Sequence, residues 1–261
     1  MGSLRTLGIA ATVTAVVVGP AGCGSADENT PATADRIFGT VTVFAAASLT
    51  ETFTELGKEF ETAHPGVKVV FGFGASSALA GQIEQGAPAD VFASAAPADM
   101  QQVVDAGEII GQPVAFVGNR LEIAVPEGNP GHITGLADFG KTEPRIALCA
   151  EQVPCGAAAK KVFEIAGITP QPDTREKDVK AVLTKVTLDE VDAALVYRTG
   201  VRAAGGKVEG IDFPESNQAV NTYPIAPLAE APNPAAAAAF VDFVTSDKAK
   251  QVFTAAGFDT P

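Results

Sequence analysis

The sequence predicts an α/β protein whose sheets are mixed but mostly parallel. Short apolar runs rich in Val, Ile, Ala and Phe alternate with longer segments in which apolar residues recur every three or four positions. The first pattern is typical of buried strands, and the second of helices that bury one face. Their alternation indicates parallel strands joined by crossover helices, because a tight turn cannot join parallel neighbours.

The pattern is clearest where the folded chain begins. Residues 40–46 (TVTVFAA) are β-branched, aromatic or small, which favours a strand, and residues 48–63 carry Leu and Phe at the spacing of one helix face. We expect Ser48 to be the N-cap of this helix, and Glu51 to complete a capping box with it. A Pro-Gly pair then predicts the end of the helix.

Further strands and helices follow in alternation. The pattern predicts strands at 67–73, 90–93, 114–117, 121–125, 145–148, 192–197, 208–213 and 222–228. It predicts helices at 76–85, from Pro97 onward, and at 155–166, 178–186, 234–245 and 247–256. In such a protein we expect the ligand site beyond the carboxyl ends of the parallel strands.

Composition indicates an ordinary globular protein. The 261 residues are 46% apolar and 19% charged, and no run after residue 23 approaches the roughly 20 apolar residues of a membrane-spanning helix. The formal net charge of −13 argues against binding to nucleic acid, which depends on cationic side chains that neutralise phosphates. We therefore expect no nucleic-acid partner.

Few residues suit catalysis. The histidines, His64 and His132, stand beside a Pro and a Gly in expected surface loops. Ser48 lacks a G-x-S-x-G setting, no H-E-x-x-H or C-x-x-C motif occurs, and Gly72 and Gly74 lack the third glycine of a dinucleotide fingerprint. We expect no enzyme activity, no cofactor and no direct cation ligands.

The first residues are predicted to be a targeting segment. A start with one cation, Arg5, leads into an apolar run at 7–18 and then into small residues before Cys23. We expect residues 1–22 to be a signal peptide. Small residues before a Cys resemble the processing site of bacterial lipoproteins, so we expect 23–37 to be a lipidated tether that holds an extracytoplasmic protein at the cell membrane. The alternative is a secreted protein in which Cys23 is free.

Two more cysteines, Cys149 and Cys155, stand six positions apart. Disulfides form outside the cytoplasm, and this spacing permits a local disulfide between them. Sequence does not give the Cα separation that a disulfide requires, so two small buried thiols remain the alternative.

Small and hydroxyl residues precede several predicted helices. They occupy 45–48 (AAAS), 74–77 (GASS), 153–156 (VPCG) and 176–179 (EKDV). Small side chains let backbone N–H groups approach a ligand, and helix N-termini supply unpaired donors with a positive dipole end. Several such N-termini in one cleft would bind an anion with neutral groups, and Ser48 and Ser76 would add hydroxyls. The alternative is that both serines are only N-caps.

Three motifs carry a resemblance to a known family. Residues 42–50 (TVFAAASLT), 73–83 (FGASSALAGQI) and 86–95 (GAPADVFASA) resemble segments of periplasmic molybdate-binding proteins, the ModA family. The resemblance extends in order over 38–258. It implies a two-lobed periplasmic-binding-protein fold of type II with a hinge, and a receptor that delivers molybdate or tungstate to an ABC permease.

The resemblance also implies a ligand set of neutral donors. The matching residues are Ser48 and Ser76 through hydroxyl and N–H, Cys155 and Val179 through N–H, and Tyr197 through its hydroxyl. Many relatives have Ala at the position of Cys155. Arg198 is a second departure, and it could reach the outer shell of the anion or be solvated or structurally paired.

Two chain crossings are expected between the lobes. They would divide the chain into lobe 1, at 38–117 plus 223–258, and lobe 2, at 118–222. We expect a monomer whose cleft size excludes sulfate, while molybdate and tungstate, which are nearly equal in size, compete. The alternatives are a receptor of the same fold for sulfate, phosphate or a chelated metal, and an enzyme with its active site between the lobes.

Overall fold

A computed structural model describes residues 37–260, which belong to one compact unit that spans 36–261. The predicted signal peptide, most of the tether and Cys23 lie outside the described residues. Within the described part, no helix is both long enough and apolar enough to cross a membrane.

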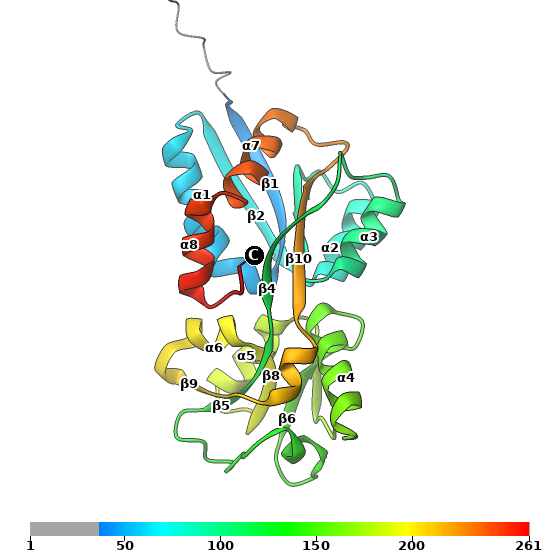
Figure 1. Cartoon of the computed structure of the whole chain (residues 1–261), viewed down its shortest axis with the longest axis vertical. Helices are drawn as coiled ribbons and strands as arrows, with labels where there is room; N and C mark the ends of the chain where they lie inside the picture. Colours follow the sequence, from blue (N-terminus) through cyan, green and yellow to red (C-terminus); the bar gives the residue numbers. More distant parts are fainter. Residues whose placement is uncertain (1–36, 261) are drawn as a thin grey trace, which may run out of the picture. The chain divides into compact units, whose positions relative to one another are not determined.

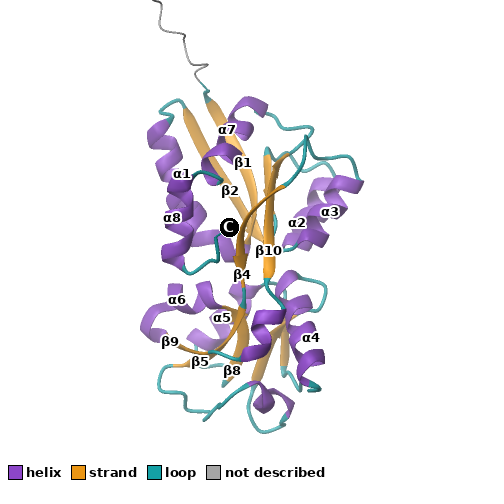
Figure 2. Ribbon diagram, in the orientation of Figure 1, coloured by secondary structure: helices purple, strands orange, loops and turns teal. Residues whose placement is uncertain are grey.

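The described residues form two five-stranded sheets (Figures 1 and 2). The first has the order β2-β1-β3-β10-β4, with β1 Gly39–Ala46, β2 Val67–Gly74, β3 Val91–Ala93, β4 Val114–Asn119 and β10 Asn221–Pro227. The second has the order β7-β6-β8-β5-β9, with β5 Leu121–Pro126, β6 Ile146–Cys149, β7 Thr174–Glu176, β8 Ala193–Tyr197 and β9 Val208–Ile211. We call each sheet with its helices lobe 1 and lobe 2.

Each sheet has one strand that runs against the other four. β10 is antiparallel to both of its neighbours in lobe 1, and β5 is antiparallel to both of its neighbours in lobe 2. The remaining pairs, β1 with β2 and β3, and β6 with β7 and β8, are parallel. The mixed, mostly parallel α/β prediction is therefore confirmed.

Helices cover both faces of the first sheet because its strands are apolar on both sides. Val41 and Val43 pack with Phe53 and Phe240 in a core under α1 (Thr50–Ala63), α7 (Pro234–Val244) and α8 (Asp247–Ala256). Phe44 and Phe92 face the other way, toward α2 (Ser76–Glu84) and α3 (Pro97–Asp105). In lobe 2, α4 (Pro154–Ala166), α5 (Val179–Thr187) and α6 (Arg198–Ala204) enclose a separate core.

The chain crosses between the lobes twice, along neighbouring strands. β4 passes into β5 through Arg120 alone, and the return follows a short 3-10 helix at Pro214–Gln218 that leads into β10. Asn119 pairs with Asn221, so the first sheet reaches two residues beyond each expected lobe boundary, 117 and 223. Figure 1 shows β4 and β10 side by side at this crossing.

The predicted N-cap at Ser48 is wrong. A 3-10 helix, Ala47–Leu49, precedes α1, the N-cap of α1 is Leu49, and no side chain caps either helix. The Ser48 hydroxyl bonds to Tyr223, which lies 175 positions away, and Glu51 forms an ion pair with Lys180 of lobe 2. Both side chains of the expected capping box are therefore used in tertiary contacts.

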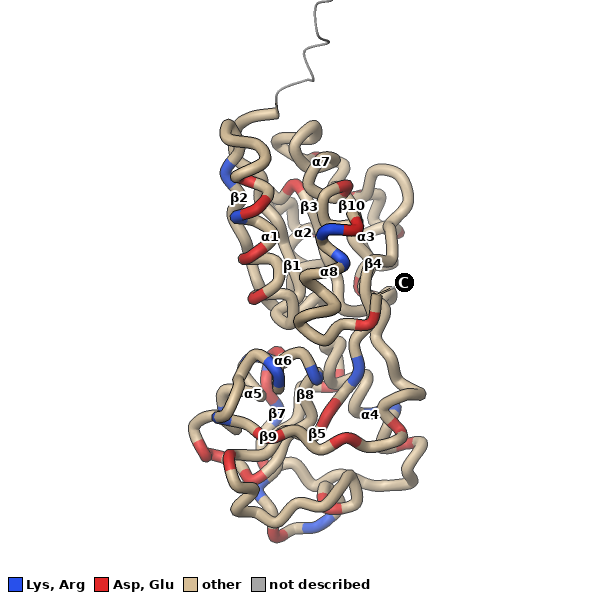
Figure 3. Tube along the Cα trace, turned by 60° about the vertical axis from the view of Figure 1, so that its left-hand side comes forward, with Lys and Arg blue, Asp and Glu red and all other residues tan. Residues whose placement is uncertain are grey.

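Among the strands and α-helices of the described residues, β7 and α6 were not predicted. β7 has three residues with the polar sequence TRE, and α6 has the mixed sequence RTGVRAA, so neither shows an apolar periodicity. The expected helix at Pro97 begins there and is confirmed. Acidic residues are distributed over both lobes rather than gathered in one patch (Figure 3).

Candidate functional site

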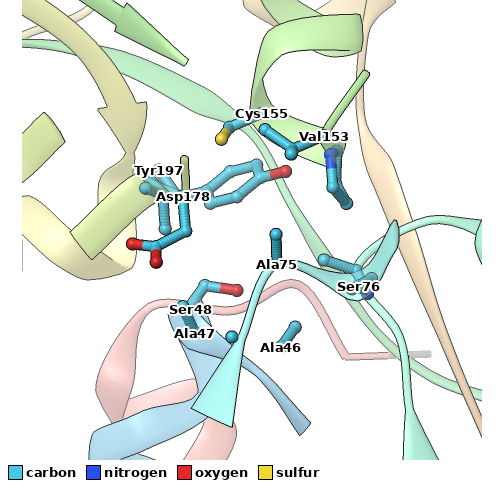
Figure 4. A pocket seen from close by; sticks show the side chains of 13 residues that line it. Ala46, Ala47, Ser48, Ala75, Ser76, Val153, Cys155, Asp178 and Tyr197 are labelled. Atoms are coloured by element: carbon cyan, nitrogen blue, oxygen red, sulfur yellow. Dashed lines mark hydrogen bonds between the residues drawn. The ribbon is translucent and has the colours of Figure 1, made fainter. Parts of the chain in front are cut away.

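A small pocket lies where segments from both lobes meet (Figure 4). Its wall follows the carboxyl ends of β1, β2, β6, β7 and β8, the position at which open α/β sheets bind ligands. The lining residues are Ala46, Ala47, Ser48, Gly74, Ala75, Ser76, Ala95, Val153, Pro154, Cys155, Asp178, Val179 and Tyr197.

The structure brings all five predicted site residues to this one pocket. Ser48 and Ser76 come from lobe 1, and Cys155, Val179 and Tyr197 come from lobe 2. All five are at least nine-tenths buried. The other lining residues are mostly Ala and Gly of the same motifs, so the motifs could also have predicted that these residues lie at the pocket.

Arg198 is not among the lining residues. Its guanidinium donates to the carbonyl oxygen of Gly257 and forms an ion pair with Asp259 at 2.6 Å. Asp259 also pairs with Arg120 at 2.8 Å, and the two arginines lower the pKa of this carboxyl against the opposing effect of burial. Arg198 is thus structurally paired, which was one of the two alternatives.

Three helices begin at the pocket. Ser76 and Val179 are the first residues of α2 and α5, and Cys155 follows Pro154 at the start of α4. The N–H groups of a first helical turn have no partner within the helix. Pro154 has no N–H, so Cys155 is the first donor of α4.

The pocket wall carries no cationic side chain and one acidic side chain. Among the lining residues there is no Lys or Arg, and the only acid is Asp178. Its carboxylate caps α5 by accepting a hydrogen bond from the Ala181 N–H at 2.9 Å. The wall therefore offers dipoles rather than a cation to an anion.

The Ser76 side chain is held as a donor. Its Oγ accepts a hydrogen bond from the Ala95 N–H at 2.9 Å, and the side chain is fully buried. An oxygen that accepts a backbone N–H keeps its own proton free to donate elsewhere. That proton is available to a ligand in the pocket.

The Tyr197 hydroxyl is buried and, among the described residues, has no hydrogen-bond partner. Burial, with the nearby Tyr223 hydroxyl as a smaller cause, raises its pKa well above the usual value, so the group stays protonated. An unsatisfied buried hydroxyl destabilises a fold by about 1–3 kcal/mol. A ligand in the pocket that accepts a hydrogen bond would remove this penalty.

Cys149 and Cys155 form a disulfide, with their Cα atoms 5.8 Å apart. It ties the end of β6 to the first turn of α4. The loop is tightly packed, because a Cβ on Gly156 would lie 1.9 Å from the carbonyl oxygen of Ala150. The Cys155 side chain is thus engaged, and its N–H remains at the pocket.

The described part of the chain gives little support for metal binding or for catalysis. There, no group of three His, Cys, Asp or Glu residues could hold a metal ion. Neither histidine lines the pocket: His64 packs on Phe60 with ring centroids 4.5 Å apart, and His132 lies in a loop with a φ of 51°. The two serines of the pocket therefore have no histidine base beside them.

Comparison with known proteins also indicates a solute-binding protein. The family described as bacterial extracellular solute-binding protein matches residues 41–259. Molybdate-binding protein ModA from Mycobacterium tuberculosis is 39% identical over 94% of this chain and 95% of that protein. The putative ABC transporter substrate-binding lipoprotein YvgL from Bacillus subtilis is 32% identical over 91% of this chain and 92% of its own length. The solved periplasmic molybdate-binding protein from Azotobacter vinelandii has a TM-score of 0.74 at 22% identity and covers 85% of this chain and 99% of that one.

Fold and pocket define a two-lobed binding protein of type II, the fold that the motifs predicted. The chain belongs to the family of bacterial extracellular solute-binding proteins. Proteins of this family bind solutes and are not enzymes, which confirms the expectation that this chain is not an enzyme.

Proposed function

We propose that this protein is the receptor of an ABC importer and binds molybdate or tungstate in the pocket between its lobes. The observation that carries the proposal is the donor set of the pocket: buried hydroxyls of Ser48, Ser76 and Tyr197 and the N-termini of three helices, with no cation in the wall. Relatives named for molybdate binding over nearly the whole chain support it.

Neutral donors suit a fully deprotonated oxyanion. Each N–H or O–H can donate to an oxyanion oxygen, whereas an oxygen that carries a proton would present a donor to a donor and lose a hydrogen bond. The net charge of −13 does not prevent binding, because salt screens charges beyond about 8 Å. Dipoles in a dry pocket act at contact, where screening is weak.

The pocket is narrow in this structure, and Ala and Gly make up much of its wall. The lobes would have to move apart to admit a tetrahedral oxyanion and then close on it. We expect sulfate, the smaller tetrahedral dianion, to fit the donors poorly, and molybdate and tungstate, which are nearly equal in size, to compete. No bound cofactor is expected.

The rest of the proposal concerns the place of the protein in the cell. Residues 1–22 would be a signal peptide and Cys23 a lipidated residue, so that the tether holds a monomeric receptor at the outer face of the membrane beside its permease. The name of YvgL, a relative described as a lipoprotein, supports the anchor. Lobes 1 and 2 would close on the anion by a hinge at the two crossings.

Calorimetric titration of the purified chain with molybdate, tungstate, sulfate and phosphate tests the proposal. We expect one-to-one binding of the first two and weak or no binding of the others. Ser76→Ala should weaken molybdate binding at least tenfold, while Ser77→Ala, next to it but outside the pocket wall, should not. Tight sulfate or phosphate binding would replace the proposed solute, and no heat from any of the four would remove the proposal.

A further inference from the structure

A line of buried polar side chains runs behind the pocket from lobe 2 to lobe 1. It begins at Thr199 in α6, passes through Asn119 at the end of β4 and Tyr223 in β10, and ends at Ser48 in the pocket wall. Asn119 Nδ2 lies 2.9 Å from Thr199 Oγ1 and 3.5 Å from Tyr223 Oη, and Tyr223 Oη lies 2.8 Å from Ser48 Oγ. All four side chains are at least nine-tenths buried.

The partners of Asn119 fix the direction of the hydrogen bonds that its own amide makes. The backbone N–H of Arg120 donates to Asn119 Oδ1 at 3.0 Å, so the other end of the amide is the NH₂ group. That group donates to Thr199 Oγ1 and, over the longer distance, to Tyr223 Oη. Tyr223 Oη therefore already accepts a hydrogen bond from Asn119.

The same order of donor and acceptor extends from Tyr223 to Ser48 in the pocket wall. The pKa of Tyr223 is raised, with burial as the largest cause, so the phenol is protonated. Tyr223 Oη and Ser48 Oγ lie 2.8 Å apart, and either hydroxyl can donate in this contact; because Tyr223 Oη accepts from Asn119, we assign its proton to Ser48 Oγ. Ser48 Oγ then accepts from Tyr223, and its own proton is left to donate into the pocket.

We propose that Tyr223 and Asn119 are positioning residues that fix the Ser48 hydroxyl as a donor toward the bound solute. The inference rests on the proposed function and deepens it, because it assigns part of the selectivity for oxyanions without a proton to residues outside the pocket wall. Without the Tyr223 hydroxyl, the Ser48 hydroxyl is free to rotate and to accept a hydrogen bond, and an oxyanion that carries a proton is then less disfavoured.

A double-mutant cycle between Tyr223→Phe and Ser48→Ala tests this role. We expect Tyr223→Phe to raise the dissociation constant for molybdate about tenfold, the scale of one buried hydrogen bond to a charged group. Because Tyr223 acts through the Ser48 hydroxyl, the same change should have almost no effect in the Ser48→Ala background. A merely structural role would weaken binding equally in both backgrounds, and that result would overturn the proposal.

A second variant and a control complete the experiment. Asn119→Ala removes the donor behind Tyr223 and should weaken binding about threefold, again only when Ser48 is present. Thr52→Val removes another buried hydroxyl of the same segment, one that bonds to the Leu49 carbonyl oxygen, and should leave affinity unchanged. Thermal melting shows that each variant is folded at the temperature of titration.

Selectivity provides an independent readout. The ratio of molybdate to phosphate affinity, measured by displacement at neutral pH, where phosphate carries a proton, should fall in Tyr223→Phe. An unchanged ratio together with equal losses in both backgrounds would refute the role of Tyr223. If the wild-type chain binds none of molybdate, tungstate, sulfate or phosphate, the proposed function itself fails. If it binds sulfate instead, the same double-mutant cycle is measured with sulfate as the ligand.

Discussion

Removing the disulfide should both destabilise the protein and loosen its pocket. In the double variant Cys149→Ala/Cys155→Ala, the end of β6 is no longer tied to the first turn of α4. Both side chains are buried, so Ala is a better replacement than a polar residue. Residue 155 lines the pocket, and its N–H would lose its fixed position.

The size of the effect follows from the loop that the disulfide closes. The two cysteines are separated by six positions, and chain-entropy arithmetic for so short a loop gives about 2 kcal/mol at 25 °C. For a folded unit of this size, each kcal/mol shifts the melting temperature by about 2–4 °C. We expect a fall of about 4–8 °C and a several-fold weaker affinity for molybdate.

Differential scanning calorimetry with and without reductant, joined to molybdate titration at 25 °C, measures both effects. Reductant should lower the melting temperature of the wild type and leave the double variant unchanged. Cys23→Ala, which removes the remaining cysteine, should behave as the wild type. A double variant with the wild-type melting temperature would refute the reasoning on stability, and unchanged affinity would show that the disulfide does not hold the donor.

Three further predictions follow from buried groups. Tyr197→Phe should weaken molybdate binding about tenfold to a hundredfold by titration, yet not lower the melting temperature, because the hydroxyl has no partner among the described residues. Gly156→Ala should cost about 1–3 kcal/mol in urea unfolding and weaken binding, because its Cβ meets the Ala150 carbonyl oxygen. Burial raises the pKa of Asp99 from 3.8 to about 6, so wild-type stability should fall as pH rises through that window. Asp99→Asn should then be about 1 kcal/mol more stable at pH 7, allowing for partial solvent exposure, and equal to the wild type below about pH 4 in pH-dependent melting.

Local patterns predicted most of the fold. The strand expected at 40–46 is Gly39–Ala46, and the helix expected at 76–85 is Ser76–Glu84, because both have strong periodicity or clear ends. β7 was not predicted because its three residues, TRE, match no apolar pattern. Motifs likewise predicted which five residues meet at the pocket, since each stands within two residues of the end of a strand or the start of a helix.

Long-range partners could not be predicted. Ser48 followed by Glu51 satisfies the local rule for a capping box, but Tyr223 and Lys180 compete for these side chains from far along the chain. The sequence could not decide whether Cys149 and Cys155 form a disulfide, because it does not give their Cα separation. Asn119 and Tyr223 were not predicted as functional residues, because no sequence spacing links them to Ser48. Only the pairing of β4 with β10 brings Asn119 and Tyr223 close to each other.

Anomalous diffraction from crystals grown with tungstate tests the central claim most directly. The account predicts one strong tungsten peak between the lobes, with oxyanion oxygens within hydrogen-bond distance of the hydroxyls of Ser48, Ser76 and Tyr197 and of the first-turn N–H groups of α4 and α5. No Lys or Arg side chain should touch the anion. A peak outside this pocket, or an anion held by a cationic side chain, would contradict recognition by neutral donors.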